Sequence, residues 1–199
     1  MSTISQDNNQ AVLKAVEFLS NGKVIGIPTD TVYGLAVDAT NPIAIENLYN
    51  LKKRDKNKPI AIFLKNIEQI EKLFMIEEIT ANLIKKHLPG KLTIVARTND
   101  EAKNKLAKNL NENNQDFLGF RVVDYFFIKK LFDKFDGILA VTSANISGDK
   151  IANSADEIKK IFPKLDLIIA GDVANSGASS VVKVENVKLI TLRAGTIKI

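Results

Sequence analysis

The stretch KVIGIPTDTVYGL (residues 23–35) decides the fold class, because in it an apolar run passes directly into a hydroxyl-rich segment. The first part, KVIGIP (23–28), is short and apolar, as is typical of a buried strand. Residues 8–21 before it carry apolar side chains at helical spacing, and Gly22 is suited to end a helix there. A helix that leads into a buried strand is a building unit of α/β sheets.

The same alternation of helices and strands continues along the chain. Asn41 followed by Pro42 predicts the start of a helix, because asparagine caps helices and proline suits the first helical position. Ser154 and Glu157 have the spacing of a capping box. Further strands are predicted at 60–64, 92–97, 118–123, 137–145, 165–171, 179–184 and 188–195, further helices at 66–74, 77–88, 124–135 and 154–162, and a loop at 99–116. This order predicts an α/β fold with a mixed sheet and helices on both faces.

Composition excludes several classes of site. The 199 residues suit one domain, residues 1–199. With no cysteine and His87 as the one histidine, disulfides, thiolate nucleophiles and cysteine- or histidine-rich metal centres are excluded, and we expect no metal ligands in the chain. The polar start MSTISQDNNQ and the lack of an apolar run of roughly 18 residues predict a cytoplasmic protein that does not enter a membrane. Lys+Arg 28 against Asp+Glu 23 gives a net charge of +5, which is consistent with anionic ligands such as nucleotides or RNA.

Four polar segments lie next to predicted strands, where ligands of α/β sheets usually bind. They are PTDTVYGL (28–35), KKRDKNKP (52–59), VTSANISG (141–148) and GDVANSGASSVVKV (171–184). Each segment also has an ordinary interpretation, as a hydroxyl-rich turn, a solvated basic loop, a helix cap or a glycine-rich turn. Taken singly, these segments do not decide between a binding site and a structural turn.

Basic side chains in these segments and in two strands suit an anionic ligand. The five Lys and Arg residues of the second segment repel one another, and an anion would relieve that repulsion. Lys52 and Arg54 would point to the same side if the chain is extended there. Arg121 and Arg193 lie in otherwise apolar strands, either as edge charges that face water or as ligand clamps that face a cavity. No general base accompanies Ser143, so a serine nucleophile is not expected.

Taken together, motifs along nearly the whole chain resemble those of the YrdC/TsaC family, the threonylcarbamoyl-AMP synthases. The matching residues, in the family's order, are PTDTVYGL (28–35), Lys52, Arg54, Lys58 and Pro59 in the pattern K-x-R-x-x-x-K-P, PGKLT (89–93), Arg121 of LGFR, TSANISG (142–148), GASSVV (177–182) and LRAG (192–195). The resemblance is to the short, single-domain form of the family. It implies an open, twisted mixed sheet flanked by helices, with a large basic cavity.

The resemblance also implies an activity. L-Threonine, bicarbonate and ATP would yield L-threonylcarbamoyladenylate and pyrophosphate, with Mg²⁺ on the ATP phosphates as the expected cofactor. A threonylcarbamoyl-transferase complex would then pass the threonylcarbamoyl group to tRNA, and tRNA is a possible further contact of the chain itself. A transfer of this kind depends on positioning and on neutralisation of charge more than on a protein nucleophile, in keeping with the cations and hydroxyls of the motifs.

The family pattern implies a role for individual residues. It implies a catalytic set of Lys52, Arg54, Ser143 and Asn145, an ATP site of Arg54, Lys58, Ser143 and Arg193, and a threonine site of Thr31, Arg121 and Ser179, with Arg121 on the substrate carboxylate. Three features depart from the pattern. Phe63 stands where many relatives have histidine, Lys91 replaces a proline, and RVVDYF (121–126) lacks the usual prolines. The departures concern the shape of the threonine pocket and not the residues that are expected to bind the ATP phosphates.

Two other functions stay open. A non-catalytic RNA-binding module could use the same basic cavity and bind phosphates independently of sequence. The chain has no tryptophan and three tyrosines, so it offers few side chains for base stacking, which argues against that function. The second alternative is a protein of the same fold that processes other carbamoyl compounds. The retained Lys52, Arg54, Ser143 and Asn145 favour the synthase.

Overall fold

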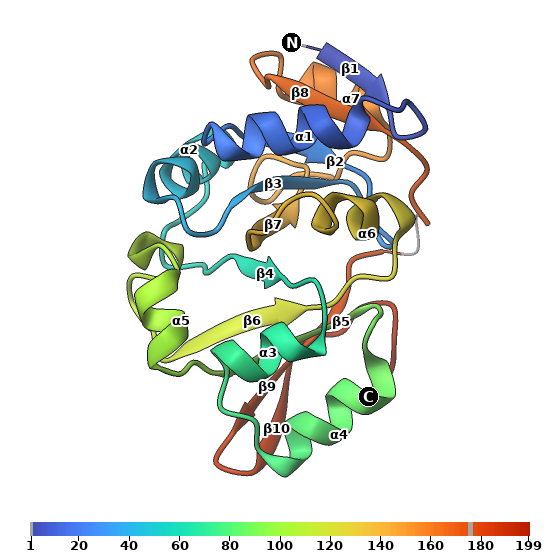
Figure 1. The fold of residues 1–199 in the computed structure, drawn as a ribbon. Coiled ribbons are helices and arrows are strands. Elements are labelled where there is room, and N and C mark those ends of the chain that lie inside the picture. Colours follow the sequence, from blue (N-terminus) through green and yellow to red (C-terminus); the bar gives the residue numbers. More distant parts are fainter. Residues whose placement is uncertain (1, 175–176) are drawn as a thin grey trace.

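A mixed sheet forms the centre of the computed structural model, which describes residues 2–174 and 177–199 (Figure 1). Within these residues ten strands are ordered β1-β8-β2-β3-β7-β4-β6-β5-β9-β10. The pairs β1·β8, β2·β8, β4·β6 and β5·β9 are parallel and the other pairs are antiparallel, so the predicted mixed sheet is confirmed. The strands are β1 (Ser2–Ser5), β2 (Ile25–Ile27), β3 (Gly34–Asp38), β4 (Ala61–Phe63), β5 (Leu92–Arg97), β6 (Phe117–Arg121), β7 (Leu139–Ser143), β8 (Leu167–Ala170), β9 (Ser180–Glu185) and β10 (Lys188–Arg193).

Helices flank the sheet, and the core is divided between its two faces. Leu35 and Val37 of β3 belong to one apolar cluster and Ala36 to a second, as expected when successive residues of a strand point to opposite faces. Figure 1 shows α1 and α6 across the strands at one end of the sheet and α3 and α4 across those at the other. The helices are α1 (Ala11–Ser20), α2 (Pro42–Lys52), α3 (Ile67–Leu73), α4 (Glu78–His87), α5 (Asp100–Lys105), the 3-10 turn η1 (Lys108–Leu110), α6 (Phe126–Phe132) and α7 (Ala155–Ile161).

Local caps account for the helix starts that position the site. The Asn41 side chain accepts hydrogen bonds from the backbone N–H groups of Ile43 (3.0 Å) and Ala44 (3.1 Å), with Pro42 in the first turn, as the sequence predicts. The Ser154 hydroxyl accepts from the N–H of Glu157 at 3.2 Å. The Glu157 carboxylate accepts from the N–H of Asn153 at 2.8 Å, one residue earlier than in the capping box that the spacing predicts.

Four elements are not predicted from the sequence: α5, η1, β1 and β3, the last of which forms at Gly34–Asp38 within and after the polar segment 28–35. The predicted loop at 99–116 contains the helix α5, whose N-terminus is capped by the Asn99 side chain on the N–H of Ala102 at 3.0 Å, and the turn η1. The polar N-terminal stretch contains β1, which pairs in parallel with β8 at the edge of the sheet. β1 and α5 are short and mostly exposed. Their stability comes from backbone pairing and from a cap, so their sequences show little apolar periodicity.

Three further observations concern membrane-spanning helices, the number of domains and the residues that the structure describes. No helix among the described residues is long and apolar enough to cross a membrane. That residues 1–199 form one domain stays a prediction. Asn175 and Ser176, which belong to the polar segment 171–184, lie outside the described residues.

Candidate active site

A cavity of about 330 Å³ is lined by residues of β3, β7, β4, β6, β5, β9 and β10, which are consecutive in the sheet, and of neighbouring loops. Its wall is built from segments that are far apart in the chain and includes the ends of several strands. The charged residues of this wall are three arginines, and no carboxylate of the described residues lines it. The polar wall residues from the predicted motifs are Thr29, Thr31, Arg54, Thr93, Arg121, Thr142, Ser143, Ser179 and Arg193.

Lys52 lies behind this wall, as the last residue of α2. Its side chain is only 1 % exposed, and Nζ donates to the backbone oxygens of Ser143 (2.6 Å) and Asn145 (2.9 Å) and to Asn145 Oδ1 (2.7 Å). The chain is not extended at 52–54, so the condition under which Lys52 and Arg54 would point to the same side is not met. The helix ends there, and Lys53 takes a left-handed conformation with φ 50°. Lys52 therefore binds the turn after β7 from behind the wall, whereas Arg54 lies in the cavity wall itself.

Ser143 and Asn145 form that turn together. Ser143 Oγ, in the cavity wall, donates to Asn145 Oδ1 at 2.7 Å. The Asn145 amide in turn donates to the backbone oxygen of Asp149 at 2.7 Å. Asn145 is buried and is not part of the wall, so its contacts orient Ser143 from behind.

Arg54 brings a guanidinium to the wall and is held there by its own loop. Nε donates to the backbone oxygen of Lys58 at 2.9 Å, and Nη2 to that of Pro59 at 3.0 Å. The Lys58 side chain is exposed and does not line the cavity. The structure therefore brings Arg54, but not Lys58, into the cavity wall. Among the other cations of this loop, Lys56 pairs with Glu46 on the surface at 2.7 Å.

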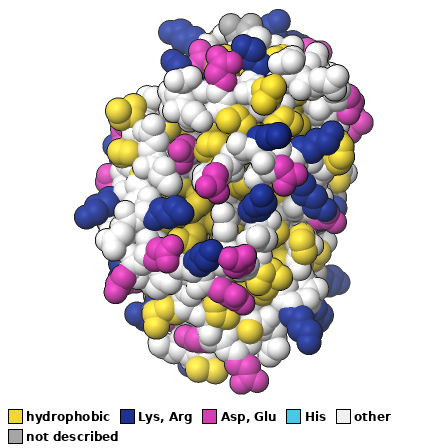
Figure 2. All heavy atoms as spheres, in the orientation of Figure 1, with side chains coloured by type: hydrophobic (Ala, Val, Ile, Leu, Met, Phe, Trp, Pro, Cys, Tyr) yellow, Lys and Arg dark blue, Asp and Glu magenta, His cyan; other side chains and the backbone are white. Residues whose placement is uncertain are grey.

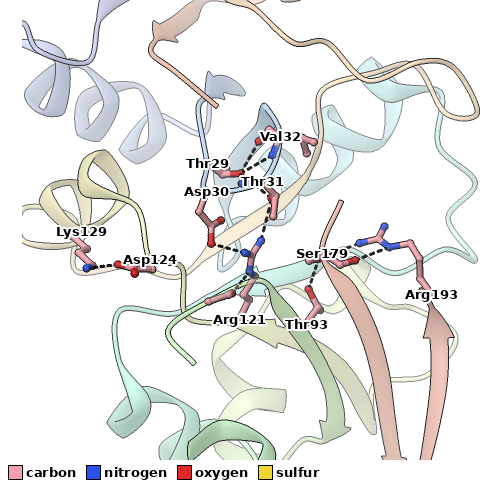
Figure 3. Close-up of polar contacts among 11 residues, drawn as sticks. Thr29, Asp30, Thr31, Val32, Thr93, Arg121, Asp124, Lys129, Ser179 and Arg193 are labelled. Atoms are coloured by element: carbon pink, nitrogen blue, oxygen red, sulfur yellow. Dashed lines mark hydrogen bonds and ion pairs between the residues drawn. The ribbon is translucent and has the colours of Figure 1, made fainter. Parts of the chain in front are cut away.

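Arg121 projects from β6 into the cavity and is only 2 % exposed. Its Nη2 donates to Asp30 Oδ2 at 2.6 Å, Nε to the backbone oxygen of Gly90 at 2.6 Å, and Nη1 to Thr31 Oγ1 at 3.3 Å (Figure 3). The guanidinium also lies 5.8 Å from the ring centre of Phe63, which lines the cavity. Of the two alternatives for this arginine, the structure excludes an edge charge that faces water, because Arg121 is buried and faces the cavity.

Ser179 and Arg193 form a second group in the wall. Ser179 Oγ lies 2.9 Å from Thr93 Oγ1, and Arg193 donates from Nε to the backbone oxygen of Ser179 (3.0 Å) and from Nη2 to its hydroxyl (3.1 Å). Figure 3 shows this group on one side of the site, with Arg121, Asp30 and Thr31 on the other. Thr93 and Asp30 lie within the motifs PGKLT and PTDTVYGL, but neither motif indicates a role for them.

The cations of the site differ in how their charge is balanced. Arg121 forms an ion pair with Asp30, whereas Lys52, Arg54 and Arg193 have no carboxylate within ion-pair distance among the described residues and donate to uncharged oxygens. Burial, and to a lesser degree the neighbouring charge of Arg54, lowers the pKa of both Lys52 and Arg193. Arg54 and Arg193 thus bring unpaired positive charge to the cavity wall, whereas the charge of Arg121 is paired with that of Asp30.

Residues 17–195 match the model of the Sua5/YciO/YrdC family, which is described as "Telomere recombination". The chain belongs to the Sua5/YciO/YrdC family. Its relatives include a protein of Methanocaldococcus jannaschii, provisionally named a threonylcarbamoyl-AMP synthase, with 35% identity over 198 residues that cover 96% of this chain and 91% of that protein. The human threonylcarbamoyl-AMP synthase is 34% identical over 170 residues, which cover 85% of this chain and 59% of the human protein.

A solved member of the Sua5/YciO/YrdC family has the same fold. The crystal structure of P. abyssi Sua5 complexed with L-threonine superimposes with a TM-score of 0.87 at 26% identity, over 97% of this chain and 56% of that one. The chain therefore spans little more than half the length of the human and P. abyssi proteins and nearly all of the M. jannaschii relative. The predicted family and the predicted fold class are confirmed.

Proposed function

We propose that this chain is an L-threonylcarbamoyladenylate synthase, which makes threonylcarbamoyl-AMP and pyrophosphate from L-threonine, bicarbonate and ATP. The relatives named threonylcarbamoyl-AMP synthases support the enzyme class. The structural observation that carries the proposal is the unequal balance of charge in one cavity. A triphosphate suits the end where Arg54 and Arg193 lack counter-ions, and an amino acid suits the neutral end at Arg121 and Thr31.

The reaction needs two bonds to form in one enclosed space. The ammonium group of threonine loses a proton, and the resulting amine condenses with bicarbonate to a carbamate with release of water. A carbamate oxygen then attacks the α-phosphorus of ATP, and the bond to the β-phosphate oxygen breaks to release pyrophosphate. The transition state gathers negative charge on the transferred and leaving oxygens, so fixed cations lower its energy more than a protein nucleophile would.

Different residues of the cavity wall would bind the phosphates, the nucleotide and the threonine. Arg54, with Arg193, would neutralise the ATP phosphates, and Lys58 would join them only if its exposed side chain turns inward. Ser143 Oγ, whose hydrogen is donated to Asn145 Oδ1, would accept a hydrogen bond from the nucleotide while Lys52 and Asn145 hold its turn in place. At the other end Thr31 and Arg121 would hold the threonine carboxylate, and Ser179 would reach the threonine from the Arg193 side of the cavity.

Magnesium fits this site as a companion of ATP. The described residues contain no group of three His, Cys, Asp or Glu side chains that could hold a metal ion, and the cavity wall offers hydroxyls and no carboxylate. Mg²⁺ usually keeps several waters and takes its remaining ligands from substrate phosphates. It would supply further neutralisation of phosphate charge there.

Binding of RNA alone fits the molecule less well. Figure 2 shows Lys and Arg side chains mixed with Asp and Glu on the face that it presents, without a continuous basic patch over that face. The uncompensated cations instead line a cavity, which suits a small anion better than a duplex. A cytoplasmic location, a contact with tRNA and transfer of the product to a threonylcarbamoyl-transferase complex remain part of the proposal.

The proposed function is tested by release of pyrophosphate. We expect the purified protein to release pyrophosphate only when ATP, L-threonine and bicarbonate are all present with Mg²⁺, and to form a product with the mass of threonylcarbamoyl-AMP. Omission of each component in turn is the control. Absence of threonine-dependent pyrophosphate at every Mg²⁺ concentration would reject the synthase, and salt-sensitive RNA binding without turnover would favour the RNA-binding module.

Lys52 makes ATP binding depend on pH. Burial, followed by the charge of Arg54, lowers the pKa of Lys52 from its ordinary value of 10.5 to about 8. In the nucleotide-free protein the ammonium is therefore lost as the pH rises through about 8. We expect ATP affinity, measured by calorimetry without threonine, to fall roughly tenfold between about pH 7 and 9.5 as one charge is lost from the site. The exposed neighbour substitution Lys53→Met should leave this dependence unchanged, and a flat profile would contradict the role of Lys52.

The same pKa predicts the opposite trend for stability. The unfolded chain keeps the Lys52 proton up to about pH 10.5, whereas the native chain releases it near pH 8. Between these values the unfolded state binds more protons, so linkage makes this residue's contribution to the free energy of unfolding rise with pH. Urea melts of the wild type and Lys52→Met over this range isolate the contribution, and equal slopes would contradict it.

A further inference from the structure

Asp30 is a buried carboxylate directly behind the cavity wall. It is only 8 % exposed, and its Oδ2 accepts from Arg121 Nη2 at 2.6 Å. Its other oxygen, Oδ1, is buried and has no hydrogen-bond partner. Burial raises the pKa of Asp30, and the positive charges of Arg121 and, to a smaller extent, Lys91 lower it in part. A half-satisfied buried carboxylate costs stability, so its presence beside the site calls for a functional reason.

The effect of Asp30 on ligands follows from its charge. A phosphate group that approaches Arg121 meets the attraction of the guanidinium and, close behind, the repulsion of the carboxylate. The net attraction between the phosphate and this ion pair is therefore small, and it does not offset the cost of removing water from the phosphate. A zwitterionic amino acid carries no net charge, so its carboxylate is attracted to Arg121 while its ammonium is attracted to Asp30. The ion pair at this end thus matches a dipolar ligand and disfavours an anion.

We propose that Asp30 is a specificity-determining residue that, by neutralising Arg121, keeps phosphate groups out of the amino-acid end of the cavity. This inference rests on the proposed function, since it concerns how ATP and threonine are assigned to opposite ends. Arg54 and Arg193, which have no carboxylate partner among the described residues, then mark the end where phosphates bind. Without Asp30 the three arginines would form one continuous anion site, and the product pyrophosphate could occupy the threonine end.

The substitution Asp30→Asn tests this inference. The amide oxygen can still accept from Arg121 Nη2, so the geometry is conserved and the charge is lost. We expect inorganic phosphate, titrated by calorimetry, to bind the variant roughly tenfold or more tightly than the wild type. We also expect pyrophosphate to become competitive with threonine in the variant, whereas in the wild type it competes with ATP. Adding Arg121→Gln to Asp30→Asn should abolish the gained phosphate binding.

A conservative variant separates charge from shape and covers the case that Asp30→Asn is unstable. Asp30→Glu keeps the negative charge and should retain the wild-type preference against phosphate. If Asp30→Asn folds poorly, phosphate should raise its melting temperature more than it does for the wild type at matched ionic strength, because the anion replaces the lost counter-charge. Unchanged phosphate affinity and inhibition pattern in folded Asp30→Asn, an equal thermal response of the two proteins, or gained phosphate binding in Asp30→Glu would each overturn the inference.

These measurements also distinguish a failure of the inference from a failure of the proposed function. Phosphate binding by calorimetry needs no turnover. A wild-type protein that binds neither ATP nor threonine and releases no pyrophosphate rejects the synthase, while the comparison of Asp30→Asn with the wild type still reports whether Asp30 controls anion binding at Arg121.

Discussion

Arg54→Ala is expected to lower the rate of threonine-dependent pyrophosphate release by roughly a hundredfold or more, the loss typical of removing one group that stabilises transition-state charge. The guanidinium lies in the cavity wall and has no carboxylate partner among the described residues, so its charge is available to phosphate oxygens. The loss should appear in kcat as well as in KM for ATP, because charge on the leaving oxygens grows in the transition state.

The fold should survive this substitution. Arg54 donates to the backbone oxygens of Lys58 and Pro59 in a surface loop, where water can replace the guanidinium. We therefore expect the melting temperature to change by a few degrees at most. Lys56→Ala is the matched control, since Lys56 lies two residues along the same loop and pairs only with Glu46 on the surface among the contacts described. Equal turnover of Arg54→Ala and Lys56→Ala would remove Arg54 from the site.

Lys52→Met is expected to damage both stability and activity. Methionine fills a similar volume, but the substitution removes the donor that joins α2 to the backbone oxygens of Ser143 and Asn145. The substitution removes the desolvation cost of the buried ammonium, but it also leaves buried acceptors without a donor, and this second effect is larger. The net loss in the free energy of unfolding is about 2–4 kcal/mol. Turnover should fall roughly a hundredfold or more, because the Ser143 turn loses its anchor and the site loses a cation.

Denaturant melts and pyrophosphate release, measured on the same preparations, check both parts of this prediction. Lys53→Met is the control, because Lys53 is adjacent and exposed. It should melt and turn over as the wild type does. A Lys52→Met protein that is as stable as the wild type, or as active, would show that the contacts of Nζ do not organise the turn.

The sequence predicts those elements whose causes are local. The start of α2 follows from Asn41 and Pro42, two adjacent residues, and the start of α7 from Ser154, whose hydroxyl caps its helix. The strand β1 escapes prediction for the opposite reason. β1 exists because β8, more than 150 residues along the chain (Ser2 pairs with Leu167), supplies its backbone partners, and its own side chains carry no apolar pattern.

The residues of the candidate site also fall into those that the sequence predicts and those whose position only the structure shows. Motifs along the chain single out Thr31, Arg54, Arg121, Ser143, Ser179 and Arg193, and all of them line one cavity. The resemblance of these motifs to those of the family was enough for this, and hydroxyls and cations also suit the binding of phosphate and carboxylate groups. The motifs do not reveal that Lys52 lies behind the wall and Lys58 outside it, because both are lysines in one basic segment and only the end of α2 separates their directions.

The amino-acid sequence by itself determined which kinds of side chain are present, where helices with local caps begin, and that the polar motifs suit an anionic substrate. Only the tertiary structure decided how charge is balanced between them. Asp30 and Arg121 are 91 residues apart in the chain, and Thr93 and Ser179 are 86 apart. Whether a buried cation meets a carboxylate or a neutral oxygen depends on distances of a few ångströms, which the packing of distant strands sets and no local pattern encodes.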